Sequence, residues 1–135
     1  MVIVLPAREK QPLKGIHILL VEDNPINILV AKTFLESWGA AIDVAENGQE
    51  AVDRLDTSKH HLVLMDLHMP VMDGYTAIRT IRGKGITIPI IALTASLPNE
   101  VETEIKGLDI DDFVLKPFVP DELFRKVKDT ACTVS

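Results

Sequence analysis

Short hydrophobic runs alternate with amphipathic stretches along most of the chain. The runs lie at residues 16–21, 41–45, 62–66, 88–93 and 112–115. Such runs are typical of strands that are buried on both faces of a parallel sheet. After each run, hydrophobic residues recur at the three- and four-residue intervals of an amphipathic helix. The pattern therefore predicts five successive strand–helix units.

Capping signals indicate where several helices begin and end. Asn24 is a predicted N-cap with Pro25 at the first helical position, and this helix is expected to end near Gly39. Its predicted inward face comprises Ile26, Leu29, Val30, Thr33 and Phe34. Asp73-Gly74 opens a later helix, and residues 120–131 form the last one.

Strand–helix repeats of this length imply right-handed crossovers and a parallel sheet with helices on both faces. The fold class is therefore α/β with an open, doubly wound sheet. An eight-stranded barrel needs about 250 residues, which excludes it for a chain of 135. We expect a flanking segment at 1–14, one domain at 15–131 and a tail at 132–135. Binding chemistry then belongs at the carboxyl ends of the strands.

Composition narrows the classes of function. The formal net charge is −6, so the chain lacks the excess of basic residues that direct nucleic-acid binding needs. The single cysteine, Cys132, has no partner for a disulfide, which indicates a reducing, cytoplasmic compartment. The hydrophobic run at 1–6 is too short to span a bilayer, so no membrane contact by this domain is expected.

Polar residues follow four of the predicted strands. Glu22 and Asp23 follow the first strand, Asp66 ends the third, Thr94 follows the fourth and Lys116 the fifth. Carboxylates held close together repel each other unless a hard divalent cation neutralises them, and oxygen ligands suit Mg²⁺. A lysine and a hydroxyl could bind phosphoryl oxygens. Asp66, at the end of the central strand, is the expected nucleophile towards phosphorus.

Four motifs resemble one known family, the receiver domain of two-component response regulators. They are Leu-Val-Glu-Asp-Asn at 20–24, Leu-Met-Asp-Leu-His-Met-Pro-Val-Met-Asp-Gly at 64–74, Ala-Leu-Thr-Ala at 92–95 and Phe-Val-Leu-Lys-Pro-Phe at 113–118. The resemblance extends over residues 15–129. It implies a flavodoxin-like, five-stranded sheet of order 2-1-3-4-5.

The resemblance also implies roles for individual residues. Asp66 would be the phosphoacceptor, and Mg²⁺, or Mn²⁺ in its place, would be bound by Asp23, Asp66 and the backbone carbonyl of His68. Glu22, where the family often has Asp, would hold the metal through water.

Further roles follow from the same resemblance. Thr94 and Lys116 would contact the phosphoryl group, and Thr94 and Phe113 would form the switch that remodels the face of the fourth helix, fifth strand and fifth helix. The bond between Lys116 and Pro117 should be cis. Such a domain is a phosphoacceptor that supports its own phosphorylation and dephosphorylation, not an enzyme with a separate substrate.

The residues at 22–27, Glu-Asp-Asn-Pro-Ile-Asn, look most like receivers of hybrid histidine kinases. The implied partner is a histidine kinase or a histidine phosphotransfer protein, and the implied state is a monomer or a weak, phosphorylation-linked dimer. A free-standing regulator and a domain cut from a larger, membrane-bound kinase both remain open.

Two other classes of function remain as alternatives. A Mg²⁺-dependent phosphatase or phosphotransferase should carry a second acid two residues after the nucleophile, where this chain has His68. A flavodoxin-like cofactor binder should have a glycine-containing first loop to cradle phosphate, but residues 22–27 are acidic and lack glycine.

Overall fold

The computed structural model describes residues 11–131, which form five strands and five helices in strict alternation. In chain order they are β1 (His17–Val21), α1 (Pro25–Ser37), β2 (Ala41–Ala45), α2 (Gly48–Arg54), β3 (Leu62–Asp66), α3 (Gly74–Gly83), β4 (Ile90–Thr94), α4 (Pro98–Ile105), β5 (Asp112–Leu115) and α5 (Pro120–Ala131). The five predicted strand–helix units are confirmed. Within the described part of the chain, no helix has the length and hydrophobicity needed to cross a membrane.

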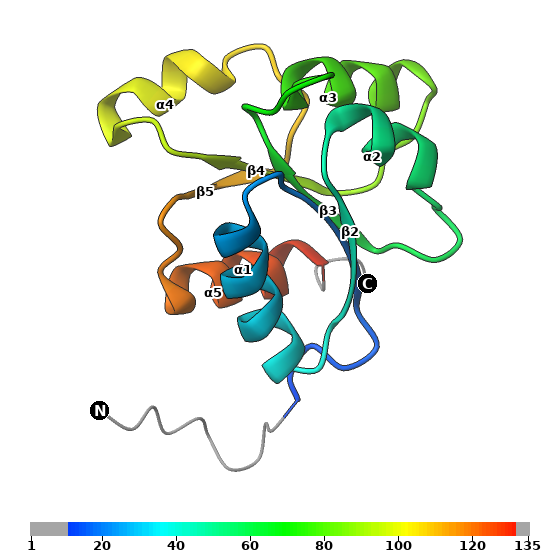
Figure 1. Cartoon of the computed structure of the whole chain (residues 1–135), viewed down its shortest axis with the longest axis vertical. Helices are drawn as coiled ribbons and strands as arrows, with labels where there is room; N and C mark the ends of the chain where they lie inside the picture. Colours follow the sequence, from blue (N-terminus) through cyan, green and yellow to red (C-terminus); the bar gives the residue numbers. More distant parts are fainter. Residues whose placement is uncertain (1–10, 132–135) are drawn as a thin grey trace.

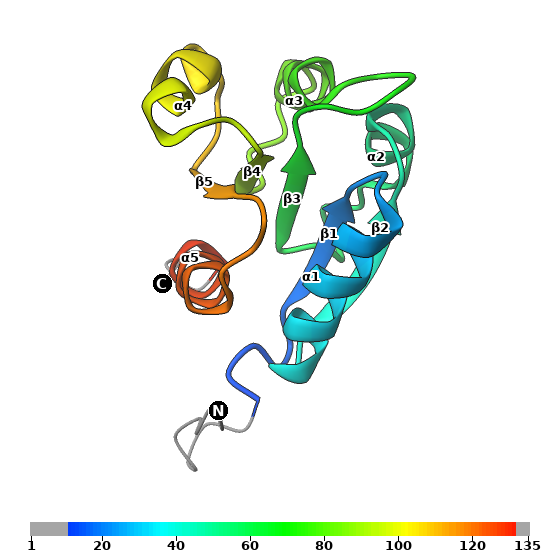
Figure 2. The same ribbon diagram turned by 60° about the vertical axis from the view of Figure 1, so that its left-hand side comes forward.

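All strand pairs are parallel, and the sheet has the order β2-β1-β3-β4-β5. The arrowheads of β1 and β3 point the same way in Figure 2. β3 is central, and all five of its residues are buried. The expected doubly wound sheet of order 2-1-3-4-5 is confirmed.

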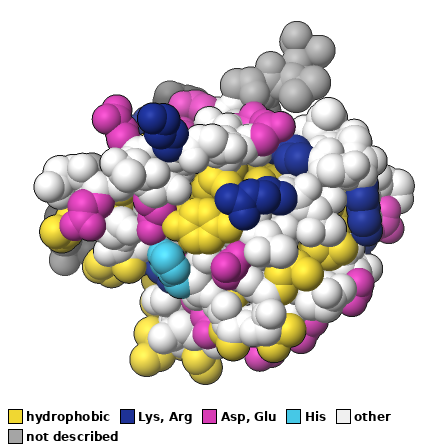
Figure 3. All heavy atoms as spheres, turned by 90° about the horizontal axis from the view of Figure 1, so that it is seen from above, with side chains coloured by type: hydrophobic (Ala, Val, Ile, Leu, Met, Phe, Trp, Pro, Cys, Tyr) yellow, Lys and Arg dark blue, Asp and Glu magenta, His cyan; other side chains and the backbone are white. Residues whose placement is uncertain are grey.

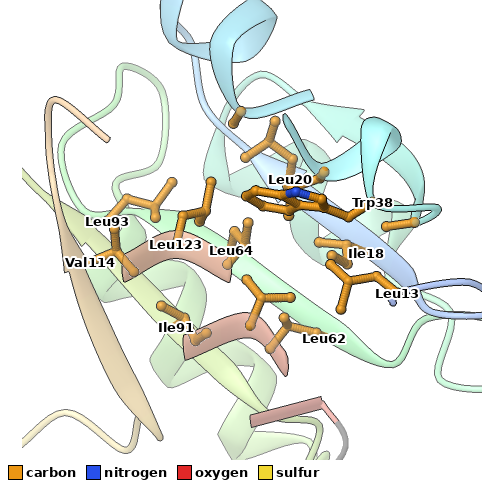
Figure 4. Packing of buried hydrophobic residues seen from close by; sticks show 14 residues of the cluster. Leu13, Ile18, Leu20, Trp38, Leu62, Leu64, Ile91, Leu93, Val114 and Leu123 are labelled. Atoms are coloured by element: carbon orange, nitrogen blue, oxygen red, sulfur yellow. The ribbon is translucent and has the colours of Figure 1, made fainter. Parts of the chain in front are cut away.

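Helices cover both faces of the sheet and create two separate hydrophobic cores. α1 and α5 pack on one face, and α2, α3 and α4 on the other (Figure 1). Residues that alternate along β1 and β3 point into different cores, because successive side chains of a strand face opposite ways. Figure 4 shows the first core, where Trp38 lies among leucines and isoleucines from the strands.

The predicted inward face of α1 was partly wrong. Ala31 and Leu35 are the buried residues of this helix, whereas Ile26 is 71% exposed and Leu29 is 65% exposed. The sequence has hydrophobic residues nearly all round α1, so spacing alone could not select the side that meets the sheet. Two hydrophobic side chains are consequently left at the surface near the start of the helix.

The expected flanking segment at 1–14 reaches into the folded unit. Leu13 is fully buried in the first core, and its backbone N–H donates to the carbonyl of Trp38 at 2.7 Å. Leu13, which lies before the expected domain start at Gly15, therefore belongs to the first core. Residues 1–10 and the expected tail at 132–135, with Cys132, lie outside the described residues.

The strand register aligns the carboxyl ends of the strands. Val21 pairs with Met65, Asp66 with Leu93, and Thr94 with Leu115. The residues that follow β1, β3, β4 and β5 therefore emerge at one edge of the sheet. This edge carries the candidate site.

Candidate functional site

Asp66 lies at the centre of this edge, with 2% of its surface exposed. Its Oδ1 accepts a hydrogen bond from the backbone N–H of His68 at 3.1 Å and lies 3.3 Å from Nζ of Lys116. A buried carboxylate requires such charge-assisted partners, because desolvation without them is costly. The predicted position of Asp66, at the end of the central strand beside a cation, is confirmed.

Glu22 directly follows β1 and is fully buried beside Asp66. Its Oε1 lies 3.2 Å from Nζ of Lys116, and its Oε2 accepts a hydrogen bond from the backbone N–H of Asn24. Burial and the negative charge of Asp66 raise the pKa of Glu22, although Lys116 opposes the shift. The carboxylates of Glu22 and Asp66 therefore carry more negative charge than Lys116 alone can neutralise.

Lys116 follows β5 and reaches both carboxylates. Its side chain is 14% exposed, and its backbone N–H donates to the carbonyl of Thr94 at 2.7 Å, which continues the β4–β5 ladder. The peptide bond between Lys116 and Pro117 is cis, as expected. The lysine is thus fixed between neighbouring strand ends, and its charge is directed at Glu22 and Asp66.

The acidic group meets the elementary requirements of a divalent metal site. Glu22, Asp23 and Asp66 each offer a carboxylate oxygen, and these atoms lie within 4.8 Å of one another. Asp23 is exposed, so the cluster is open to solvent on one side. An all-oxygen donor set with room for water suits Mg²⁺. The raised pKa of Glu22 is the electrostatic cost that a cation would offset.

No side-chain hydrogen bond joins Thr94 or Phe113, the two expected switch residues, to Asp66 within residues 11–131. Thr94 is fully buried, and in residues 11–131 its hydroxyl bonds to Glu104 and Ser96, not to Asp66. Phe113 is half-buried, with Nζ of Lys126 4.2 Å from the centre of its ring. No local sequence pattern indicates Glu104, which lies ten residues after Thr94 and contacts it because α4 packs beside the end of β4.

The loop from β3 to α3 forms one wall of the site. A Cβ at Gly74 would lie 2.2 Å from the carbonyl oxygen of Asp66, so only glycine allows α3 to begin this close to β3. Asp73 caps the helix by accepting from the backbone N–H of Thr76, as predicted. Val71 has a φ of 69° and is 85% exposed. This backbone region is costly for a β-branched residue, which marks the loop as a strained part of the site.

A second group of potential metal ligands lies at the opposite edge of the sheet and was not anticipated. Asp43 Oδ2 lies 3.1 Å from Nε2 of His17, 2.9 Å from Nε2 of His60 and 3.0 Å from Nζ of Lys59. Nδ1 of His60 accepts from the backbone N–H of Asp56, so Nε2 carries the proton and donates to Asp43. His60 is thus oriented for hydrogen bonding, not for metal ligation. The hydrogen bond from His60 and that from Lys59 lower the pKa of Asp43.

An acidic site at the carboxyl ends of a five-stranded, doubly wound parallel sheet places the protein in the flavodoxin-like class. The family model described as response regulator receiver domain matches residues 18–128. The chain therefore belongs to the receiver domain family.

Two relatives illustrate the range of proteins in which similar domains occur. The chain is 45% identical over 115 residues to the two-component response regulator ORR41 of Oryza sativa subsp. japonica, a match that covers 82% of this chain and 90% of that protein. It is 37% identical over 134 residues to histidine kinase 5 of Arabidopsis thaliana, covering 78% of this chain but 14% of the kinase. Similar domains thus occur both as nearly whole proteins and as parts of kinases.

Two solved structures are similar over most of the chain. The receiver domain of the sensor histidine kinase PA1611 of Pseudomonas aeruginosa PAO1 has a magnesium ion in its active-site cleft; it matches with a TM-score of 0.77 at 38% identity, covering 87% of this chain and 98% of that one. The second is a chain in the co-crystal structure of the histidine phosphotransfer protein Ypd1 with the receiver domain of Ssk1, from Saccharomyces cerevisiae. It matches with a TM-score of 0.80 at 31% identity, covering 89% of this chain and 91% of that chain.

Proposed function

We propose that this domain is a phosphoacceptor switch of a two-component phosphorelay, in which Asp66 accepts a phosphoryl group from a phosphohistidine of a partner protein. The observation that carries the proposal is the position of Asp66, buried at the end of β3 within 3.3 Å of Lys116. Membership of the receiver family supports it. The exchange is expected in the cytoplasm, because a sequence with one cysteine has no disulfide pair of its own.

The transfer exchanges one bond to phosphorus for another. An oxygen of Asp66 forms the new P–O bond as the P–N bond to the partner's imidazole breaks, and the imidazole nitrogen retains the bonding electron pair. Lys116 supplies positive charge beside the attacking oxygen, which favours the anionic transition state. The hydroxyl of Thr94 would donate to a phosphoryl oxygen once it turns towards Asp66.

Asp23, Asp66 and the backbone carbonyl of His68 are the residues that we propose to hold Mg²⁺, with Glu22 acting through water and Mn²⁺ as a substitute. The magnesium ion in the related PA1611 receiver supports this assignment. When bound, the ion would neutralise charge on the carboxylates and on the phosphoryl oxygens. The positive charge would oppose the burial and the repulsion from Asp66 that raise the pKa of Glu22.

The surface around the site fits a protein partner. The large hydrophobic residues that are exposed in residues 11–131 all follow strand ends at this edge of the sheet: Ile26, Leu29, Val71, Leu97 and Val119. Hydrophobic side chains surrounding a polar centre are typical of a protein–protein contact surface. We propose a histidine phosphotransfer protein or a histidine kinase as the partner, since the related Ssk1 receiver forms a complex with Ypd1.

Labelling with a small phosphodonor tests the assignment of Asp66. Incubation with acetyl phosphate and Mg²⁺ should add the mass of one phosphoryl group, measured by intact-protein mass spectrometry. Asp66→Asn should abolish the addition, and chelation of Mg²⁺ should reduce it strongly. Asp53→Asn, which changes an exposed aspartate on α2, is the matched control and should label normally. Undiminished labelling of Asp66→Asn would refute the proposal.

A further inference from the structure

The carboxylate of Glu104, on α4, is surrounded by hydrogen-bond donors from three other segments. Its Oε1 accepts from the hydroxyl of Thr94, and its Oε2 accepts from the hydroxyl of Ser96 at 2.7 Å and lies 3.0 Å from Nε2 of His68. Tyr75 on α3 also contributes a side-chain hydrogen bond. The side chain of Glu104 is only 13% exposed. Such a partly buried, multiply bonded carboxylate holds its donors firmly.

The charge state of Glu104 agrees with this geometry. Burial raises the pKa of Glu104, but the hydrogen bonds from Thr94, Ser96, His68 and Tyr75 outweigh it and lower the pKa to about 2. Burial and the contact with Glu104 raise the pKa of Tyr75 to about 12. At neutral pH, Glu104 is therefore ionised and can only accept hydrogen bonds, while Tyr75 keeps the proton that it donates.

The hydroxyl of Thr94 has a single proton, so it can donate to only one acceptor at a time. In this structure the acceptor is Glu104, and the oxygen of the same hydroxyl accepts from the backbone N–H of Ser96 at 3.1 Å. A phosphoryl oxygen on Asp66 would need that same proton. Glu104 and a phosphorylated Asp66 therefore compete for Thr94.

We propose that Glu104 is a latch that retains Thr94 in its resting position and thereby opposes the phosphorylated state of the domain. The proposal rests on the phosphoacceptor function above. Release of Thr94 removes one of the bonds that tie α4 to the end of β4, while the bonds of Glu104 to His68 and Tyr75 still tie α4 to the β3–α3 side of the site. The strength of the latch thus sets how readily α4 responds to phosphorylation. Glu104 bonds to the hydroxyl of Thr94 and to the imidazole of His68, whose backbone carbonyl is a proposed metal ligand, but in residues 11–131 it makes no hydrogen bond to Asp66, so it is a positioning residue.

The test measures the affinity of the domain for beryllofluoride, a stable phosphoryl analogue, in the presence of Mg²⁺. Glu104→Gln keeps the shape of the side chain but replaces a charged acceptor by a neutral one, which forms a weaker hydrogen bond. We expect this variant to bind beryllofluoride roughly three- to tenfold more tightly than the wild type. Glu102→Gln removes the same charge from an exposed position on the same helix and should bind as the wild type does.

A double-mutant comparison shows whether the effect passes through Thr94. In a Thr94→Val background, which lacks the hydroxyl, Glu104→Gln should change the affinity by less than about twofold. A merely structural role for Glu104 predicts the opposite pattern, because loss of packing would weaken beryllofluoride binding with or without the hydroxyl. Tighter binding that persists in the Thr94→Val background would also overturn the latch.

Wild-type protein provides an independent measurement if Glu104→Gln fails to fold. Three-bond NMR couplings of the Thr94 methyl group report its χ1 angle, which should change when beryllofluoride and Mg²⁺ are added. An unchanged χ1 would overturn the latch. A wild type that takes up neither beryllofluoride nor a phosphoryl group would overturn the phosphoacceptor function as well, whereas normal uptake with equal affinities for the Glu104→Gln and Glu102→Gln variants would overturn the latch alone.

Discussion

Glu22 illustrates how a single residue in this site can lower stability while serving the proposed function. It is fully buried, and its nearest charged neighbours are Asp66, which repels it, and Lys116, which attracts it. The net effect is a raised pKa, so the folded protein binds this proton more tightly than the unfolded chain does. The associated stability is present at acid pH and is lost as pH rises through the raised pKa.

Replacement of this carboxylate should therefore stabilise the metal-free protein. Glu22→Gln should increase the free energy of unfolding at neutral pH by about 1 kcal/mol, and the gain should vanish at a pH where Glu22 is protonated in the wild type. Urea unfolding in the presence of a chelator, at pH 4 and pH 7, measures both effects. The same variant should bind Mg²⁺ more weakly. A loss of stability at pH 7 without Mg²⁺ would contradict the electrostatic interpretation.

Some residues of the site could be identified from the sequence and others could not. Glu22, Asp66 and Lys116 were found because each follows a hydrophobic run, and parallel strands bring their carboxyl ends to one edge. Glu104 follows no strand, and the pattern of α4 is weak. Its contact with Thr94 depends on how far α4 packs from the sheet, which no local pattern encodes.

At the scale of single helices, some features could also be predicted from the sequence and others could not. The start of α3 was predicted from Asp73 and Gly74, because an N-cap and a helix start have local signatures. The side of α1 that faces the sheet was not, since Ile26 and Leu29 compete with Ala31 and Leu35 for the same role. Periodicity identifies a helix, but the choice between two hydrophobic sides is made by tertiary packing.

The close approach of α3 to β3 predicts opposite effects of alanine at the two glycines that begin and end α3. Gly74→Ala should lower the free energy of unfolding by about 3 kcal/mol or more, because the new Cβ would overlap the backbone of Asp66 and Leu67. Gly83→Ala, at the other end of α3, meets no atom within 4 Å and should stabilise the protein by roughly 0.5 kcal/mol. Chemical denaturation of both variants measures the difference. Equal stabilities would contradict the close approach.

At the scale of the whole molecule, the sheet divides the surface into regions of different character. On the face that Figure 3 shows, the basic side chains are scattered and do not gather into one patch. The hydrophobic residues exposed around the site, by contrast, share one feature, which is that each follows a strand end. The exposed hydrophobic residues thus follow strands whose carboxyl ends share one edge with Asp66, which is where we propose that the partner binds.

This arrangement predicts that partner recognition and phosphoryl chemistry can be separated. Leu29→Asp places a charge in the exposed hydrophobic surface and should slow transfer from a phosphohistidine protein by roughly tenfold or more. Labelling by acetyl phosphate should be unaffected, because that donor needs no docking surface. Ser37→Asp adds the same charge at an exposed position at the opposite end of α1 and serves as the control. Equal transfer rates for the two variants would exclude this surface from the contact.

The chain contains one tryptophan, and its location determines what fluorescence can report. Trp38 is 6% exposed, stacked on Phe34 at a ring-centre distance of 5.9 Å and packed edge-on against Phe124 at 5.0 Å. It therefore belongs to the α1 and α5 layer, while Glu104 and α4 lie across the sheet. Intrinsic emission should follow global unfolding closely, but a rearrangement confined to α4 needs a reporter placed on the other layer.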